Sequence, residues 1–129
     1  MIINIFYKVN IDDLDPDTVH DMLLFIYKGM LENLGKGKAK RLLTAAEKYD
    51  LKTLKQMCEE LLCEKMDTDN VLEMLLLSDL NRASTLRAQA VKYILAHGKQ
   101  VVSQSGWREK LKMYPEIICD LFEAATNKP

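Results

Sequence analysis

Residues 41–62 read RLLTAAEKYDLKTLKQMCEELL, and this stretch decides the fold. On either side of Tyr49-Asp50 its apolar residues recur at gaps of three and four, which is the period of an α-helix. Each half therefore carries one apolar stripe, and the residues of the two stripes are Leu42, Leu43, Ala46 and Tyr49, then Leu51, Leu54, Cys58, Leu61 and Leu62. The stretch predicts two helices hinged at Tyr49-Asp50, which need neighbours to bury their stripes.

The same pattern returns 32 residues later in the chain. Shifting the sequence by 32 places Thr53-Leu54-Lys55 over Thr85-Leu86-Arg87. The other stripe residues also fall on residues suited to a buried face, in the pairs Leu42/Met74, Leu43/Leu75, Cys58/Ala90, Leu61/Tyr93 and Leu62/Ile94. A second helical hairpin of the same shape is therefore predicted.

The rest of the chain is predicted to be helical except at its beginning. Residues 1–11 (MIINIFYKVNI) are rich in isoleucine and aromatics and form the one convincing strand candidate. Further helices are expected over 66–80, 84–97, 100–112 and from Pro115 onward, with Ser105-Gly106-Trp107 restarting a helix. Asp67 or Thr68 is expected to cap the first of these helices and Ser84 the second. The predicted fold class is mainly α, a helical bundle with one N-terminal strand.

A helix is also predicted over residues 12–29, between the strand candidate and a loop. Asp15 is suited to cap it, and Pro16 suits its first position, where the missing N–H costs nothing. Its expected buried stripe consists of Val19, Leu23, Ile26 and Met30. Two glycines and several lysines over residues 30–40 predict a loop.

Composition indicates an ordinary globular chain. The chain has 129 residues, of which 48% are hydrophobic and 29% charged, enough for one domain with its own core. A net charge of −1 gives no overall attraction to nucleic acid or to an anionic membrane. No apolar run reaches the ~18 residues of a membrane span, and no stretch resembles a signal peptide. An odd number of cysteines, three, is typical of a reducing compartment, so we expect a nuclear or cytoplasmic protein.

Residues that could carry out catalysis are scarce. His20 and His97 have no cysteine or carboxylate at the spacing of metal ligands. Cys58, Cys63 and Cys119 are expected to be buried, unreactive thiols. No nucleophile, phosphate-loop or dinucleotide motif is present. We therefore expect a protein without enzymatic activity, metal or cofactor.

One local cluster of positive charge stands out, namely Lys36, Lys38, Lys40 and Arg41. Such a cluster could contact phosphate or serve in nuclear import. A solvated loop leading into a helix is the favoured interpretation. A helical nucleic-acid-binding protein stays as an alternative, which the net charge of −1 disfavours.

Residues 9–122 resemble the C-terminal half of the speckle-type POZ proteins, a family that joins MATH, BTB and short BACK modules. The strings that carry the resemblance occur in the family's order, and they are Ile11-Asp12-Asp13-Leu14-Asp15-Pro16, Phe25-Ile26-Tyr27-Lys28-Gly29, Leu43-Thr44-Ala45-Ala46-Glu47-Lys48-Tyr49, Met57-Cys58-Glu59, Leu77-Ser78-Asp79-Leu80, Gln89-Ala90-Val91 and Ser105-Gly106-Trp107. The resemblance implies three segments. Residues 1–65 would form the second half of a BTB/POZ domain, residues 66–97 the helix pair called the 3-box, and residues 98–129 a short BACK module. A MATH domain and the first half of the BTB fold have no counterpart here, and Ile3 stands where the family carries the acid of its cullin-contact motif.

The resemblance also implies a function. Similar proteins are non-catalytic substrate adaptors of cullin-3-type ubiquitin ligases, so the expected partners are a cullin-3-type scaffold protein and other BTB or BACK chains, with no membrane. The residues expected to contact the cullin are Met66, Val71, Met74, Leu75 and Leu77. The residues expected in a second self-association surface, on the last helix, are Ile118, Leu121 and Phe122. Self-association without cullin recruitment is the alternative function.

Overall fold

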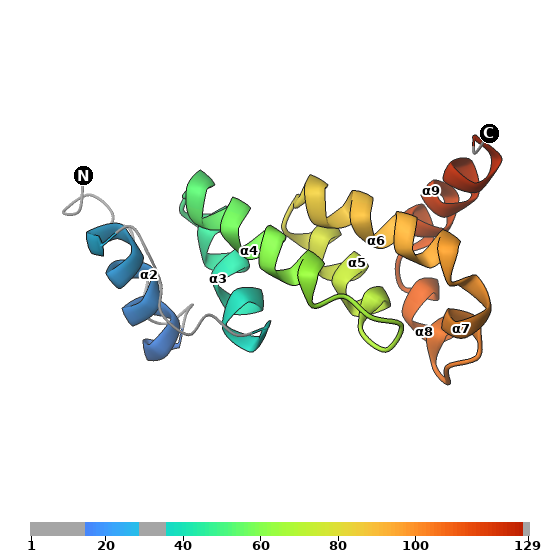
Figure 1. Cartoon of the computed structure of the whole chain (residues 1–129), viewed down its shortest axis with the longest axis horizontal. Coiled ribbons are helices and arrows are strands. Elements are labelled where there is room, and N and C mark those ends of the chain that lie inside the picture. The colour runs from blue at the N-terminus through green and yellow to red at the C-terminus, as the bar shows by residue number, and fades with distance from the viewer. Residues whose placement is uncertain (1–14, 29–35, 128–129) are drawn as a thin grey trace. The chain divides into compact units, whose positions relative to one another are not determined.

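A computed structural model of the protein describes residues 15–28 and 36–127 (Figure 1). Helices joined by short turns make up these residues, and no strand occurs among them. The mainly α fold class is therefore confirmed, while the strand predicted at 1–11 lies outside the described residues. The chain divides into two compact units, Met1–Glu64 and Lys65–Pro129.

The N-terminal unit contains three described helices, α2 (Pro16–Lys28), α3 (Lys36–Lys48) and α4 (Lys52–Glu64). Helix α3 packs against both α2 and α4. The core of the N-terminal unit is formed by the buried side chains of Met22, Phe25, Ala39, Leu42, Leu43, Ala45, Ala46, Leu54, Cys58 and Leu62. The apolar stripes predicted on either side of the hinge therefore do supply most of this core.

Helix α2 begins as the sequence predicts. One carboxylate oxygen of Asp15 accepts a hydrogen bond from the Thr18 backbone N–H at 2.8 Å, and the other accepts one from the Thr18 hydroxyl at 2.8 Å. These bonds favour the ionised carboxylate, so they lower the pKa of Asp15. Pro16 occupies the first helical position, and the cap is complete.

The buried face of α2 differs from the prediction. Val19, Leu23 and Ile26 are only half-buried, whereas the buried residues are Thr18, Met22 and Phe25. Residues 22–26 are apolar without a break, so their period does not show which of two adjacent faces turns inward. Met30, the fourth predicted stripe residue, lies outside the described residues.

Helix α3 starts earlier than predicted. Residues 36–40 were expected in a loop but form the first turns of α3. Gly37 lies within the helix, where a glycine is tolerated at a cost of ~1 kcal/mol relative to alanine. The loop predicted from the two glycines and the lysines was therefore wrong for residues 36–40.

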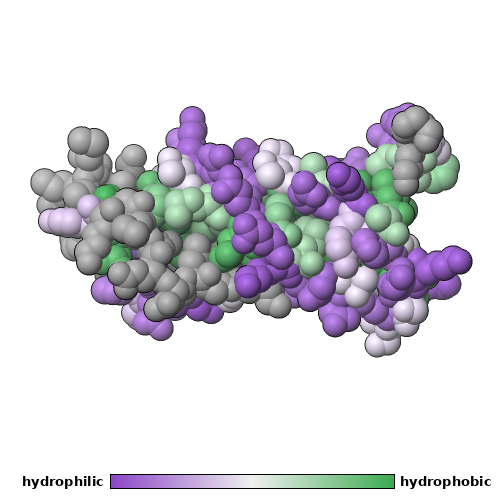
Figure 2. Space-filling model, viewed as in Figure 1, coloured by the Kyte–Doolittle hydropathy of each residue, from purple (hydrophilic) through white to green (hydrophobic). Residues whose placement is uncertain are grey.

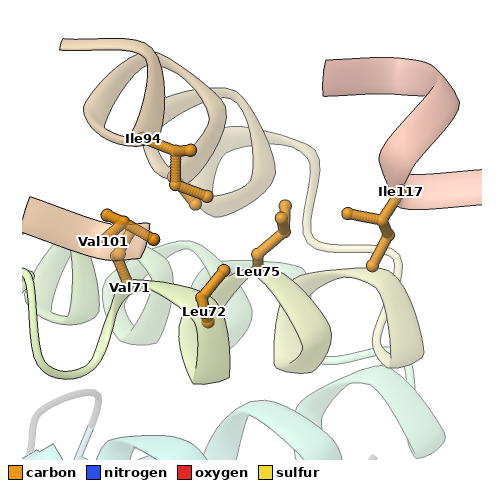
Figure 3. Close-up of a cluster of buried hydrophobic side chains, with 7 residues drawn as sticks. Val71, Leu72, Leu75, Ile94, Val101 and Ile117 are labelled. Atoms are coloured by element: carbon orange, nitrogen blue, oxygen red, sulfur yellow. The ribbon is translucent and has the colours of Figure 1, made fainter. Parts of the chain in front are cut away.

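The C-terminal unit contains five helices in the described residues, α5 (Val71–Leu80), α6 (Ser84–Ala96), α7 (Gly98–Val102), α8 (Trp107–Lys112) and α9 (Pro115–Thr126). Helix α6 contacts α5, α7 and α9, and α8 contacts α9. Side chains from α5, α6, α7 and α9 converge on one core, as Figure 3 shows. We call this the C-terminal core, and it consists of Val71, Leu72, Leu75, Ala90, Ile94, Val101 and Ile117. Half-buried Trp107 packs against it from α8.

The starts of α5 and α6 correct two predictions. Helix α5 begins at Val71 rather than at residue 66, because a turn precedes it. In that turn the side chains of Asp67 and Asn70 each accept a 2.8 Å hydrogen bond from the other's backbone N–H. Ser84 does not cap α6; it is the first helical residue, and Ala83 before it makes no side-chain cap bond. Gly106 adopts a φ of 84° just before α8, and that helix restart is confirmed.

The two hairpins predicted from the 32-residue shift share their turn geometry. Asp50 and Arg82 are left-handed, with φ of 55° and 52°. The next residue in each turn donates a backbone hydrogen bond to a carbonyl five residues back, from Leu51 to Ala46 at 2.9 Å and from Ala83 to Ser78 at 2.8 Å. Helices α3–α4 and α5–α6 are therefore two copies of one hairpin, and the repeat is confirmed.

An ion pair also repeats across both turns. Lys55 Nζ lies 3.3 Å from Glu47 Oε2, and Arg87 Nε lies 3.9 Å from Asp79 Oδ1. Each pair joins the first helix of its hairpin to the second, at positions that again differ by 32. The buried positions coincide as well, in the pairs Ala39/Val71, Leu42/Met74, Leu43/Leu75, Ala46/Ser78, Leu54/Leu86, Cys58/Ala90 and Leu62/Ile94.

Candidate functional site

Groups suited to metal binding do not gather in residues 15–28 and 36–127. No three side chains of His, Cys, Asp or Glu in these ranges are close enough to hold a metal ion. His97 lies at the end of α6, where its ring stacks on Tyr93 at 4.1 Å and its Nδ1 is 3.1 Å from the Tyr93 carbonyl oxygen. Within the same ranges no helix has the length and apolarity to cross a membrane.

The three cysteines differ in exposure and therefore in reactivity. Cys58 is fully buried, and burial raises the pKa of its thiol to about 12. Cys63 is half-buried, and burial raises the pKa of its thiol too. The prediction of a buried thiol is thus correct for Cys58 and wrong for Cys119, which is exposed on α9.

We expect iodoacetamide at about pH 8 to alkylate Cys119 first and to leave Cys58 unmodified, because only the exposed thiolate reacts. Peptide mapping by mass spectrometry measures the order of modification. The same treatment in urea is the control and should modify all three thiols. Labelling of Cys58 at the rate of Cys119 in the folded protein would contradict the burial of Cys58.

Two residues of the basic cluster, Lys38 and Arg41, belong to helix α3 and pair with acidic side chains of α2 and its cap. Lys38 Nζ is 3.7 Å from Asp21 Oδ2, and Arg41 Nε is 3.7 Å from Asp15 Oδ2. Both basic residues belong to α3 and both acidic partners to the segment of α2 and its cap. These pairs offset the local positive charge, so they weaken the nucleic-acid alternative.

Three of the five expected cullin contacts are core residues. Val71 and Leu75 belong to the C-terminal core and have no exposed surface. Figure 3 shows both side chains among the other residues of this core. Met74 is also fully buried. A partner cannot touch a side chain that has no exposed surface. These three residues are therefore not available for direct contact in this structure. Helix α5 is apolar nearly all round, so its sequence does not distinguish the packed side from the outer side.

One leucine of α5, Leu80, is exposed, whereas Leu76 is half-buried and packs against the C-terminal core. Half-buried Leu77, a predicted contact, lies near Leu76 and Leu80, at the spacing of one helical face, and Leu80 is 65% exposed. We call Leu76, Leu77 and Leu80 the α5 leucine stripe. The equivalent residues of α3 are Thr44, Ala45 and Lys48, so the first hairpin has no such stripe. Half-buried Met66, the remaining predicted contact, packs against the C-terminal core.

Sequence reasoning missed Leu80 as an exposed residue. The signal was nevertheless present in the 32-residue comparison, because exposed Thr44 and Lys48 become leucines in the second hairpin. A hydrophobic residue at a position that the repeat leaves in solvent is typical of an interaction surface.

The last helix divides the predicted self-association residues into two groups. Ile118 is 46% exposed and Phe122 is 70% exposed, one helical turn apart on the same face of α9. Leu121 is half-buried and packs against the C-terminal core. We call Ile118 and Phe122 the α9 ridge, and this ridge is available to a partner.

A comparison with protein families finds a match in the first part of the chain. The family model of the BTB/POZ domain matches residues 4–66, a range that includes α2, α3 and α4. A BTB/POZ domain is therefore detected in this chain, in agreement with that part of the resemblance. BTB/POZ domains are generally protein-interaction modules rather than enzymes, so an interaction or adaptor role is supported.

Proposed function

We propose that this protein is a non-catalytic adaptor or scaffold module of a cullin-3-type ubiquitin ligase, related to the speckle-type POZ proteins and acting in the nucleus or cytoplasm. The observation that carries the proposal is a BTB/POZ match followed by a hairpin whose first helix carries an exposed leucine, Leu80. BTB/POZ domains often bind cullin-3. The α5 leucine stripe supports the same partner, since it lies in the segment that the resemblance equates with the 3-box.

Calorimetric titration with the N-terminal domain of cullin-3 tests the proposal. We expect binding in the micromolar range or tighter, corresponding to at least about −8 kcal/mol. Leu80→Asp should weaken binding by at least about tenfold, because a charge replaces an apolar side chain in the contact. The substitution should leave folding intact, because Leu80 is 65% exposed.

Phe122→Asp is the matched control for the cullin titration. Phe122 is 70% exposed, close to the exposure of Leu80, but it lies on α9 rather than α5. Circular dichroism should show that both variants keep the helical content of the wild type. A folded wild-type protein that does not bind cullin-3 would refute the adaptor proposal, and equal losses in both variants would refute the assignment to α5.

Self-association through the α9 ridge is the second candidate function. The exposure of Ile118 and Phe122 on one face supports it, since an apolar pair in solvent is suited to contact another chain. Light scattering should then show smaller species for Phe122→Asp and unchanged species for Leu80→Asp. An unchanged size for Phe122→Asp would contradict this role of α9.

A further inference from the structure

Helices α8 and α9 form a third helical hairpin, which is shorter than the other two and follows the 32-residue period at the end of its first helix. Helix α8 ends at Lys112, which is 32 residues after the end of α5 at Leu80. The Tyr114 N–H donates to the Leu111 carbonyl at 3.0 Å, at the place where Arg82 donates to Asp79 at 3.5 Å in the second hairpin. Tyr114, however, has a φ of −137° rather than a left-handed value.

The altered turn changes where the second helix of this third hairpin begins. Helix α9 starts at Pro115, one residue earlier than the 32-residue period would place it. Helix α9 contacts α6, yet a hollow remains between the two helices. In a stack of helical hairpins each neighbour covers the apolar face of the one before it. Here the third hairpin covers that face of α6 incompletely.

The uncovered part of α6 forms a continuous groove beside α9. Two adjoining hollows, of about 530 Å³ and 370 Å³, share Ala88, Val91 and Ala124. Hydrophobic surface is visible beside α9 in the space-filling view (Figure 2). The remaining lining residues are Ser84, Arg87, Asp120, Glu123 and Asn127 in the first hollow and Lys92, Leu95 and Ala96 in the second. We call the whole the α6–α9 groove.

The residues of α6 that form the floor of this groove are more apolar than the equivalent residues of α4. Val91 and Leu95 replace Glu59 and Cys63, and Ala88 replaces Gln56, at the equivalent positions of α4. The second hairpin thus has aliphatic side chains where the first has polar or ionisable ones. The groove follows α6 from Ser84 to Ala96, a length of about 18 Å on a rise of ~1.5 Å per residue, and Ala88, Val91 and Leu95 line about 10 Å of it. Such a groove suits a helix that lies along it.

The two ends of the groove differ in charge. Lys92 lies toward the C-terminal end of α6, and Glu123 lies at the other end of the groove, which also holds Ser84 at the start of α6. Arg87 pairs there with Asp120. Glu123 is therefore the carboxylate at this end that can interact with a positive charge of a bound partner. The partial positive charge of a helix N-terminus is stabilised near a carboxylate, and the partial negative charge of a C-terminus near an ammonium group. These ends therefore favour a helix that runs parallel to α6.

We propose that the α6–α9 groove binds an amphipathic α-helix of a partner protein, with a basic first turn beside Glu123 and an acidic last turn beside Lys92. Aliphatic side chains on one face of that helix fill the space over Ala88, Val91 and Ala124. This surface is separate from the α5 leucine stripe and does not depend on cullin binding.

Two labelled synthetic peptides of equal composition, each of about 14 residues, test the proposal by fluorescence anisotropy. Both carry leucines on one helical face. One has lysines in its first turn and glutamates in its last turn, and the other has these charges exchanged. The exchanged peptide is the better isolated helix, since its charges suit its own dipole. Binding of the first peptide at least about tenfold tighter than the second would therefore reflect the groove and not helicity.

Matched variants locate the binding. Ala88→Glu obstructs the groove and should weaken the first peptide by at least about tenfold. Ala125→Glu is the control, because Ala125 is an exposed alanine of α9 that does not line the groove, and it should leave binding unchanged. The double variant Lys92→Glu/Glu123→Lys should reverse the preference between the peptides. No saturable binding, equal binding of both peptides, or equal losses in the two alanine variants would overturn the proposal.

A cullin-3 titration of Ala88→Glu separates this proposal from the adaptor function. Since Ala88 lies on α6 and not in the α5 leucine stripe, the variant should bind cullin-3 as the wild type does. Loss of cullin binding in Ala88→Glu would mean that the groove belongs to the cullin contact, and it would overturn the separate partner helix.

Discussion

Replacing Leu75 by aspartate is expected to unfold the C-terminal unit. Leu75 has no exposed surface and packs in the C-terminal core. Truncating a buried leucine to alanine costs ~2–5 kcal/mol, and a carboxylate placed there adds the cost of burying an unpaired polar or charged group. A domain of this size is stable by only ~5–15 kcal/mol, so most of that margin is lost. Thermal unfolding followed by circular dichroism measures the effect.

Leu80→Asp is the control for this prediction, because it makes the same chemical change on the same helix at an exposed position. Its midpoint of thermal unfolding should stay close to that of the wild type, since exposed substitutions usually change stability by less than ~0.5 kcal/mol. If Leu75→Asp kept a wild-type midpoint, the assignment of Leu75 to the core would be wrong. Partner contacts of α5 are therefore best tested through Leu80 and not through Leu75.

Replacing Ile117 by alanine is expected to release α9 from the C-terminal unit. Ile117 is the buried residue of α9 and reaches the C-terminal core, as Figure 3 shows. Its truncation should cost ~2–5 kcal/mol. The ion pair between Arg87 and Asp120 is partly exposed and is expected to offset little of this loss. Amide hydrogen exchange of residues 115–126 should accelerate most strongly.

The adjacent Ile118→Ala makes the comparison direct, because the same side chain is truncated one residue further along the helix. Ile118 is 46% exposed, so its loss should change the free energy of unfolding by less than ~1 kcal/mol. Equal exchange rates in the two variants would show that α9 is not anchored through Ile117. The peptide-binding groove should also disappear in Ile117→Ala, since α9 forms one of its walls.

The hairpins were predictable because their signals agree at several levels. Apolar spacing located the helices, and the hinge at Tyr49-Asp50 coincides with the left-handed Asp50. The shift by 32 residues then predicted the second turn, where Arg82 is left-handed in the same way. The caps at Asp15 and Pro16 follow from local chemistry, which does not depend on tertiary contacts.

The orientation of individual helices was not predictable to the same degree. Helix α5 and the middle of α2 are apolar over consecutive residues, so several faces satisfy the helical period. Which face is buried then depends on neighbouring helices. For that reason Val71, Met74 and Leu75 were expected at a partner surface but are core residues. The exposure of Cys119 has the same origin, because burial statistics for a residue type carry no information on its face of α9.

The exposed residues of the candidate site had a weaker signal in the sequence. Leu80 and Phe122 look like core residues by composition, and only their positions on the helices separate them from Leu75 and Ile117. The expectation that Leu77, Ile118 and Phe122 serve binding stays a prediction, as does the division of residues 66–129 into 3-box and BACK segments. The cullin titration and light scattering described above test these assignments.

The repeated turn geometry has a consequence for how the chain folds. The hairpins α3–α4 and α5–α6 each join their helices through three residues, so most of their contacts are local, and such topologies fold quickly. The two hairpins also match in the positions of their helix ends at the turn, in their buried positions and in an ion pair with the acid on the first helix and the base on the second. Helices α4 and α6 are therefore similar partners for α3. Discrimination between them then depends on differences in side-chain volume, such as Cys58 against Ala90. At high concentration during refolding, this similarity favours exchange of hairpin helices between chains.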